Sequence, residues 1–195
     1  MNALLIDPGL SNMAKPRDES CAEESELIEA AKRDPNAFAQ LYRQQYPVIF
    51  RYVLRRVGNQ LVAEDLVADV FVAMVRYLPK YRVRDVPFHA WLYRLATNRV
   101  NRWARWQRRK AGKELREFAC PRRDQEQRDT AAHVRTALLT LPLPFQTALA
   151  LHYLEGMSIA EIGRVIDCSL GTVKSRLSRG REMMRIKLKE SGGVE

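Results

Sequence analysis

The hydrophobic and polar positions of this chain follow a helical pattern. From about residue 25 onward, apolar residues recur at steps of three and four, the spacing that places them on one face of an α-helix. Gly58 and Asn59 interrupt the first run, and a second helix is predicted over residues 61–78. No useful length of sequence alternates apolar and polar residues as a half-buried strand does. The pattern therefore predicts an all-α fold.

Breaks in this pattern predict two small helical domains joined by a flexible linker. Residues 79–87 form a loop bracketed by prolines, and a long helix is predicted from Phe88 to about residue 109. The residues after that helix are charged and lack an apolar stripe. The predicted parts are a mobile N-terminal extension, a first domain, a linker, a second domain and a tail, at residues 1–25, 26–109, 110–130, 131–190 and 191–195.

Two short helices with a tight polar turn between them are predicted near the C-terminus. Ser158 and Glu161 have the spacing of a capping box, which satisfies free backbone N–H groups at a helix start. Ser169 can cap the second helix in the same way. The inward-facing residues are predicted to be Ile159, Ile162, Val165 and Ile166 on the first helix, and Leu170, Val173 and Leu177 on the second.

The second of these helices leaves polar and basic side chains on its outer face. A helix held across a partner by a short turn presents such side chains to base edges in the major groove of DNA. The pattern therefore predicts a helix-turn-helix, although an ordinary helical hairpin with a solvated basic face has the same local signals. The outward residues are Thr172, Lys174, Ser175, Arg176, Ser178 and Arg179.

The charge of the chain favours a polyanionic partner. Lys and Arg number 33 against 23 Asp and Glu, so the formal net charge is +10. The charge is also uneven. Residues 1–27 carry two cations and six acids, a sum of −4, whereas residues 91–123 carry eleven cations and two acids, a sum of +9.

The helix predicted from Phe88 has an apolar face and a basic face. The basic face and the preceding loop interleave cations with aromatic rings, as a site for separated nucleic-acid bases requires. Alternatively, Trp91 and Tyr81 fill a neighbouring helix interface and the arginines are solvated. The apolar face comprises Phe88, Leu92, Ala96, Val100 and Trp103, and the basic region comprises Lys80, Tyr81, Arg82, Arg84, Trp91, Arg94, Asn98, Arg102, Arg105 and Arg109.

Two acids on the helix predicted over residues 61–78 need a compensating charge. Asp65 and Asp69 lie one turn apart on the same face, an arrangement that costs a few tenths of a kcal/mol in isolation. The positive end of the helix dipole can compensate for Glu64 and Asp65 near the helix start. A basic surface on a protein partner is the other explanation. Both remain open on the residues alone.

Metal binding and catalysis are not predicted. Cys21, Cys120 and Cys168 are too few and too far apart for a zinc cluster or a disulfide framework, and an odd count suits a reducing compartment. The three histidines, at positions 89, 133 and 152, have no metal-ligand spacing. No nucleophile lies in a supporting basic constellation. We therefore expect a protein without catalytic residues, metal or cofactor.

Membrane insertion and export are not predicted either. No stretch approaches the roughly 20 apolar residues that span a bilayer. Residues 1–13 lack the basic leading segment and the long apolar core of a signal peptide. Together with the cysteine count, these observations predict a cytoplasmic protein.

Three blocks of sequence, in this order, resemble the extracytoplasmic-function (ECF) group of bacterial RNA polymerase sigma factors. The blocks are AEDLVADVFVAMVRYLPKY, FHAWLYRLATNRVNRW and LPLPFQTALALHYLEGMSIAEIGRVIDCSLGTVKSRLSRGRE. The resemblance covers roughly residues 28–190. Three ordered blocks are far more specific than a helix-turn-helix alone.

The resemblance implies a factor that binds core RNA polymerase and directs it to promoters. By resemblance, the helix carrying Asp65, Leu66 and Asp69 docks on the clamp helices of the beta-prime subunit, which supply the missing cations. The second domain, from Ala131, binds the beta flap. The resemblance also allows an anti-sigma factor as a further partner, although no residue identifies one.

The resemblance assigns each basic surface to one promoter element. The second domain recognises the minus-thirty-five element as duplex; Lys174 and Arg179 are expected to contact base edges, and Thr172 and Arg176 to contact phosphates. The first domain recognises and melts the minus-ten element, where an extruded base is bound. The minus-ten residues implied are Lys80, Tyr81, Arg82, Arg84, Trp91, Arg94, Asn98, Asn101, Arg102 and Arg105.

The C-terminal helices are also compatible with a second function. A helix-turn-helix transcriptional activator that acts without stable polymerase binding would share the C-terminal helices. Such a protein normally adds a receiver or ligand-binding domain, and the N-terminal half here has no α/β alternation.

Overall fold

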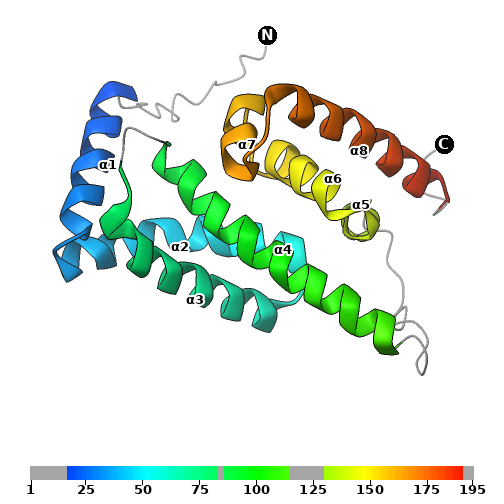
Figure 1. Cartoon of the computed structure of the whole chain (residues 1–195), viewed down its shortest axis with the longest axis horizontal. Coiled ribbons are helices and arrows are strands. Elements are labelled where there is room, and N and C mark those ends of the chain that lie inside the picture. Colours follow the sequence, from blue (N-terminus) through cyan, green and yellow to red (C-terminus); the bar gives the residue numbers. More distant parts are fainter. Residues whose placement is uncertain (1–16, 83–85, 115–129, 191–195) are drawn as a thin grey trace, which may run out of the picture. The chain divides into compact units, whose positions relative to one another are not determined.

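The computed structural model describes residues 17–82, 86–114 and 130–190. Every regular element within these ranges is helical (Figure 1), which confirms the predicted all-α fold. The described residues fall in two compact units, one ending at Arg43 and the other beginning at Gln44. Most of the predicted linker, the predicted tail and Arg84 lie outside the described residues.

The first unit contains α1 (Arg17–Ala31) and the start of α2 (Pro35–Val57). Helix α1 begins at Arg17, so helical structure reaches into the segment predicted as an extension. Pro35 opens α2, where its missing N–H would have no partner in any case. The Asp34 carboxylate accepts a hydrogen bond from the Asn36 N–H at 2.9 Å and so caps this helix start.

The predicted break at Gly58 and Asn59 is confirmed at the junction of α2 and α3 (Gln60–Tyr77). Gly58 ends α2 at φ +71°, a left-handed conformation that favours glycine, and its N–H donates to the Leu54 carbonyl at 2.8 Å. Asn59 caps α3, because its side-chain oxygen accepts from the Val62 N–H at 3.0 Å.

Helices α3 and α4 (Phe88–Glu114) pack together in the second unit. The short 3₁₀ helix η1 (Leu78–Lys80) follows α3, and α4 runs five residues past its predicted end at residue 109. The hydroxyls of Tyr52 and Thr97 lie 2.8 Å apart and link α2 to α4. As predicted, the apolar face of α4 is buried at Phe88, Leu92, Ala96 and Val100, with Trp103 half-buried.

The remaining helices of the second unit are α5 (Thr130–Thr140), α6 (Leu143–Leu149), the π-helical turn η2 (Ala150–Leu154), α7 (Ile159–Ile166) and α8 (Leu170–Glu190). Helix α8 packs against α5, α6 and α7 (Figure 1). Gly180 permits the close approach of α8 to α6, because a Cβ atom there would lie 3.0 Å from Leu149. The buried residues of this bundle include Leu141, Ala148, Leu151, Ile162, Val165, Val173 and Leu177.

Candidate nucleic-acid interface

The predicted helix-turn-helix is present in α7 and α8. Ser158 and Glu161 form the predicted capping box: the Glu161 N–H donates to Ser158 Oγ at 3.2 Å, and the Ser158 N–H donates to Glu161 Oε2 at 2.8 Å. The hydrogen bonds from Ser158 lower the pKa of the Glu161 carboxyl, which keeps it ionised. The start of α7 is therefore fixed by its own side chains.

The turn between α7 and α8 is tight. Asp167 ends α7 in the left-handed conformation, at φ +51°. The backbone then passes Gly163 so closely that a Cβ atom at that position would lie 3.0 Å from the Cys168 carbonyl oxygen. Ser169 caps α8 as predicted, because its Oγ accepts from the Thr172 N–H at 3.2 Å. This geometry holds α8 in one orientation across α7.

The outer face of α8 presents its polar and basic side chains at different depths. Lys174 and Arg179 are exposed, as are Ser175 and Ser178. The Thr172 hydroxyl lies 2.9 Å from Ser169 Oγ, and the half-buried Arg176 points an amino group toward Cys168 Sγ at 3.9 Å.

The prediction that Leu170 faces inward was wrong. Its side chain is 53% exposed, because α8 begins at this residue and the inward stripe starts one turn later, at Val173.

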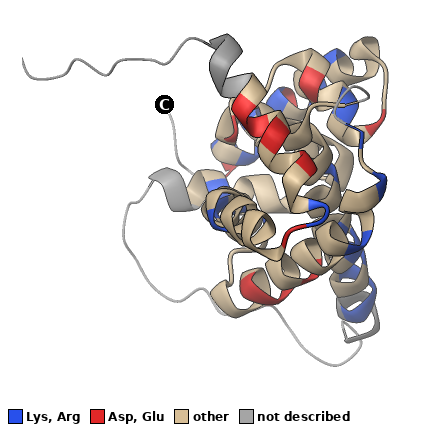
Figure 2. Ribbon diagram, turned by 90° about the vertical axis from the view of Figure 1, so that its left-hand side faces the viewer, with Lys and Arg blue, Asp and Glu red and all other residues tan. Residues whose placement is uncertain are grey.

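Helix α4 presents the second basic surface. Asn98, Arg102 and Arg105 are exposed, and Arg94 and Asn101 are partly buried. Figure 2 shows basic residues gathered toward the C-terminal end of α4. Trp106 was not predicted from the sequence; its side chain is 51% exposed, and the Lys110 ammonium lies 5.7 Å from the centroid of its ring. Its position one turn after Arg102 was the available signal.

The aromatic residues before and within α4 pack against one another. The Tyr81 and Trp91 ring centroids lie 5.0 Å apart, and Phe88 lies within 5.7 Å of both rings. Tyr81 is only 6% exposed, and its hydroxyl donates to the Val86 carbonyl at 2.6 Å. Lys80 and Arg82 are exposed at the start of the loop. In this conformation Tyr81 thus helps to shape the loop that leads into α4.

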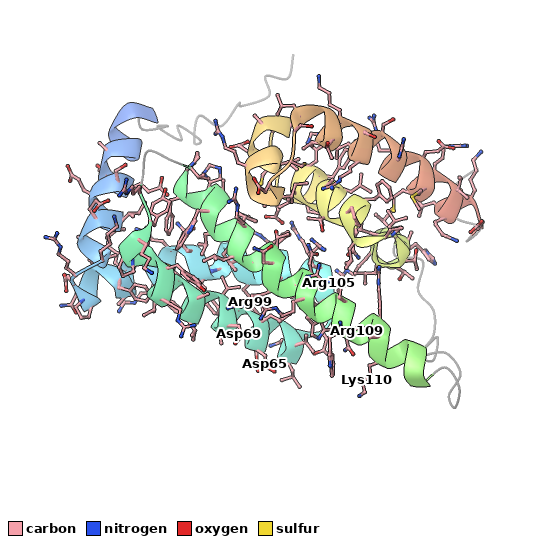
Figure 3. The ribbon with its side chains drawn as sticks, in the orientation of Figure 1. Asp65, Asp69, Arg99, Arg105, Arg109 and Lys110 are labelled. Carbon is pink, nitrogen blue, oxygen red and sulfur yellow. The ribbon has the colours of Figure 1, made fainter. Side chains whose placement is uncertain are left out.

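The acidic pair lies on the exposed side of α3 (Figure 3). Asp65 and Asp69 are both exposed, whereas Leu66 is buried between α3 and its neighbours. Because α3 begins at Gln60, Asp65 lies beyond the first turn, where the helix dipole acts most strongly. The dipole is therefore a weak explanation for this pair.

A buried arginine that was not predicted from the sequence joins helices from both halves of the second unit. Arg56 on α2 is 2% exposed, and its guanidinium donates to Tyr52 Oη at 3.0 Å and to Asn101 Oδ1 at 3.1 Å. It also donates to Gln146 Oε1 and Thr147 Oγ1 on α6, both at 3.2 Å. Among the described contacts, every acceptor of this charge is a neutral oxygen.

A carboxylate forms a second junction. Glu155, which follows η2, has a side chain that is 4% exposed and accepts a hydrogen bond from Tyr93 Oη at 2.6 Å. Arg55 lies 3.4 Å from the same carboxylate and donates to the Leu154 carbonyl at 2.9 Å. Burial and, secondarily, the bond to Glu155 raise the pKa of Tyr93, so its hydroxyl stays a donor.

Helix α4 also contacts α7 of the helix-turn-helix. His89 Nε2 lies 3.1 Å from Glu161 Oε1, and the Arg94 guanidinium donates to the Arg164 carbonyl. A recess of about 170 Å³ opens beside this contact, lined by Asn98, Asn101, Arg105, Thr147, Ile166 and Arg176. Residues predicted to bind the minus-ten element thus line one recess together with a residue predicted to bind the minus-thirty-five element.

Among the described residues, no group of His, Cys, Asp and Glu side chains is arranged to hold a metal ion. His152 Nδ1 lies 2.9 Å from the Met157 carbonyl oxygen. None of the helices in the described ranges has the length and apolar character that a membrane span requires.

Comparison with protein families matches both halves of the chain. Residues 41–110 match the family model of sigma-70 region 2, and residues 132–184 match that of sigma-70, region 4. The chain is 30% identical over 176 residues to the RNA polymerase sigma-H factor of Pseudomonas aeruginosa, of which it covers 91%. It is 34% identical over 154 residues to the ECF RNA polymerase sigma factor SigE of Mycolicibacterium smegmatis, of which it covers 59%.

Solved structures share the fold. The structure of CnrH in complex with the cytosolic domain of CnrY matches 87% of this chain and 98% of CnrH, with a TM-score of 0.64 and 25% identity. The sigma factor RpoE of Bartonella quintana, solved with the anti-sigma factor NepR, has a TM-score of 0.62 at 22% identity, covering 78% of this chain and 96% of RpoE, and supports the fold alone.

Two sigma-70 regions in order, on an all-helical chain with a helix-turn-helix, define a bacterial transcription initiation factor. The chain belongs to the ECF group of RNA polymerase sigma factors, non-enzymatic DNA-binding proteins that direct promoter-specific transcription. The alternative of an activator that acts without stable polymerase binding has no support from these matches.

Proposed function

We propose that this sigma factor binds its partners through three surfaces: α3 binds core polymerase, α4 binds the minus-ten element and α8 binds the minus-thirty-five element. The observation that carries the proposal is the presence of two separate cationic helices, α4 and α8, within the matched sigma regions. The region 2 domain is proposed over residues 26–109 and the region 4 domain over 131–190, close to the matches at 41–110 and 132–184.

The minus-thirty-five surface is proposed on the outer face of α8. Lys174 and Arg179 are exposed and long enough to reach guanine O6 and N7 in the major groove, at about 1 to 3 kcal/mol of discrimination each. Thr172 and Arg176 are partly buried and tied to the turn at Ser169 and Cys168. That restraint suits contacts with phosphates, which set the register of the helix on DNA. Ser175 and Ser178 complete the surface.

The minus-ten surface is proposed on α4 and the loop before it. The cations of this surface suit the backbone of a separated strand, and aromatic rings stack on bases at roughly 1 to 3 kcal/mol each. Trp106 adds an exposed ring to those chosen from the sequence. The full proposed set is Lys80, Tyr81, Arg82, Arg84, Trp91, Arg94, Asn98, Asn101, Arg102, Arg105 and Trp106.

Two surfaces are proposed for core RNA polymerase. Asp65 and Asp69 are exposed and lie beyond the first turn of α3, where the helix dipole would compensate for their charge. A basic surface such as the beta-prime clamp helices would offset their repulsion. The beta flap is proposed to bind a groove of about 650 Å³ between α5, α6, η2 and α8, whose apolar lining includes Val134, Leu138, Leu149, Tyr153, Met184 and Leu188.

A protein regulator and a cytoplasmic location are part of the same proposal. CnrH, which is 25% identical to this chain, was solved in complex with the cytosolic domain of CnrY, and this complex supports a protein partner for this chain as well. An anti-sigma factor is the class expected. The cytoplasm follows from the proposed work on promoter DNA with core polymerase.

Run-off transcription tests the proposal as a whole. The purified chain would be combined with bacterial core polymerase and a pool of templates with randomised upstream sequence. We expect RNA from a subset of templates that share two upstream elements, and co-elution of the chain with core polymerase. If no site-selected RNA forms and the chain does not co-elute, the proposed function is wrong.

A further inference from the structure

Polar side chains connect the region 2 helices to the region 4 helices within residues 44–195. The Arg56 cluster joins α2 and α4 to α6, and the Glu155 cluster joins α2 and α4 to the residue after η2. Arg108 near the end of α4 donates to the Leu141 carbonyl at 2.8 Å. Together with the α4 contacts to α7, these bonds hold region 4 against region 2 in a closed conformation.

Arg56 has the properties of a reversible latch. A buried charge is costly unless its donors are satisfied, and here neutral oxygens from both regions accept from the two terminal amino groups, whereas Nε has no partner among the described residues. Tyr52 and Asn101 belong to region 2, so they can remain with Arg56 when region 4 leaves. Water can replace Gln146 and Thr147 as acceptors, because an opened guanidinium would be solvated. Such an interface closes with defined geometry yet can open without stranding a charge.

The closed conformation conflicts with simultaneous binding to both promoter elements. Asn98, Asn101 and Arg105 line one recess of about 170 Å³ with Arg176. The two elements are centred about 25 base pairs apart, or roughly 85 Å of duplex at 3.4 Å per base pair. Side chains that line one recess cannot contact both elements at that separation.

We propose that the free sigma factor rests in this closed state, in which region 4 masks the Asn101 side of the minus-ten surface and Arg56 acts as the latch. The inference rests on the proposed function, because it takes the assignment of Asn98, Asn101, Arg105 and Arg176 to DNA from there. Binding to core polymerase then requires the two regions to separate. The masking explains how a strongly basic chain avoids unproductive contact with DNA before it meets polymerase.

One position allows the latch to be loosened or tightened. Gln146 is 3% exposed, is bonded to Arg56, and belongs to none of the proposed binding surfaces. Gln146→Lys places a second cation against the buried guanidinium and favours the open state. Gln146→Glu gives Arg56 a carboxylate partner and favours the closed state. The matched controls are Gln60→Lys and Gln60→Glu, because Gln60 is exposed on α3 and bonded only locally to Glu64.

Two measurements on the full chain separate closure from masking. Small-angle X-ray scattering reports the radius of gyration, and fluorescence anisotropy reports affinity for a fork DNA of mixed sequence, duplex at one end and single-stranded at the other. For Gln146→Lys we expect a larger radius of gyration and about tenfold tighter DNA binding than for Gln60→Lys. For Gln146→Glu we expect an unchanged radius and weaker binding than for Gln60→Glu.

An equal radius of gyration for Gln146→Lys and Gln60→Lys would overturn the latch. A larger radius with no gain in DNA affinity would overturn the masking. Circular dichroism checks that each variant is folded. If Gln146→Lys does not fold, Glu155→Gln, which removes the charge opposite Arg55, must give the same direction of change in both readouts or the proposal is wrong. Failure of the proposed function is recognised separately, by the absence of site-selected RNA in transcription.

Discussion

The two proposed DNA surfaces differ in what holds them in place. The surface on α8 is fixed by short-range features: the Ser158 capping box, the left-handed Asp167 and the Ser169 cap. The surface on α4 is in contact with helices far away in the sequence, and Asn101 is shared between Arg56 and Thr147. We therefore expect the minus-thirty-five surface to be formed already in the isolated chain, whereas the minus-ten surface depends on the arrangement of the two regions.

The largest expected effect concerns region 2 alone. Replacing both Asp65 and Asp69 with Ala should weaken binding to core polymerase by about 10- to 100-fold, or roughly 1.4 to 2.7 kcal/mol, because two exposed anions are removed from the proposed docking face. Titration of labelled sigma factor with core polymerase measures this. Glu64→Ala is the matched control, since Glu64 is exposed on the same helix but bonded to Gln60.

In the same experiment, the affinity of the free variant chain for duplex minus-thirty-five DNA should not fall. Unchanged affinity for core polymerase would refute the docking assignment. A loss of both activities would indicate that the acids stabilise the whole chain, which would remove the contrast between the two regions.

The next effect concerns region 4 alone. Lys174→Ala or Arg179→Ala should reduce discrimination between minus-thirty-five sequences by about 1 to 3 kcal/mol, because a cation in the major groove distinguishes guanine from the other bases. Competition binding of the wild-type and variant holoenzymes to templates that differ in one base pair measures the difference. Lys187→Ala is the matched control, because Lys187 is an exposed cation on the same helix, is bonded locally to Glu190 and lies outside the proposed surface.

The features that the sequence predicts correctly are the short-range ones. The helix-turn-helix was predicted nearly residue by residue, because caps and apolar stripes depend on neighbours three or four positions away. Leu170 was placed wrongly, since residues at a helix end do not obey the periodicity of its interior. The apolar face of α4 was predicted correctly for the same local reason.

The contact between the two regions was not predicted. Arg56 and Gln146 are separated by 90 positions, and no periodicity relates them. In the sequence Arg56 follows Arg55, a pair that reads as a solvated basic end of a helix. Only the packing of α2 against α4 and α6 makes one of these two arginines 2% exposed. Long-range polar partners of this kind leave no signal in a single sequence.

A smaller effect distinguishes residues that contact phosphates from residues that contact base edges. Arg176, which lines the recess between the two regions, is the test case. Arg176→Ala should weaken binding to all minus-thirty-five sequences alike and lower the slope of log affinity against log salt concentration by about one unit, because one phosphate contact is lost. The slopes are obtained by measuring affinity for minus-thirty-five DNA at a series of salt concentrations, with Lys174→Ala measured in parallel. If both variants change the selectivity between minus-thirty-five sequences in the same way, the division into phosphate-contacting and base-contacting residues is wrong.

The smallest expected effect tests whether short-range features alone hold the α8 surface in place. The pKa of Glu161 is lowered, first by its hydrogen bonds with Ser158 and less by His89. A carboxyl whose pKa is lower in the folded chain stabilises the fold at pH values above its ordinary pKa of 4.5. This contribution is lost as the pH falls through the lowered pKa. Glu161→Gln cannot titrate, so its free energy of unfolding should fall less between pH 7 and pH 3 than that of the wild type, by about 0.5 kcal/mol.

Urea unfolding at a series of pH values measures this difference, and Glu64→Gln on α3 is the control for the loss of an exposed carboxylate. Ser158→Ala adds a second arm: it removes the hydroxyl that caps α7 and should reduce stability by about 1 kcal/mol at neutral pH. In that background, Glu161→Gln should change the acid dependence less than it does in the wild type, because the main cause of the lowered pKa is gone. Equal effects in both backgrounds would exclude the Ser158 hydroxyl as the main cause and leave the Ser158 N–H and His89 on α4, and the His89 contact would make the helix-turn-helix depend on region 2 as well.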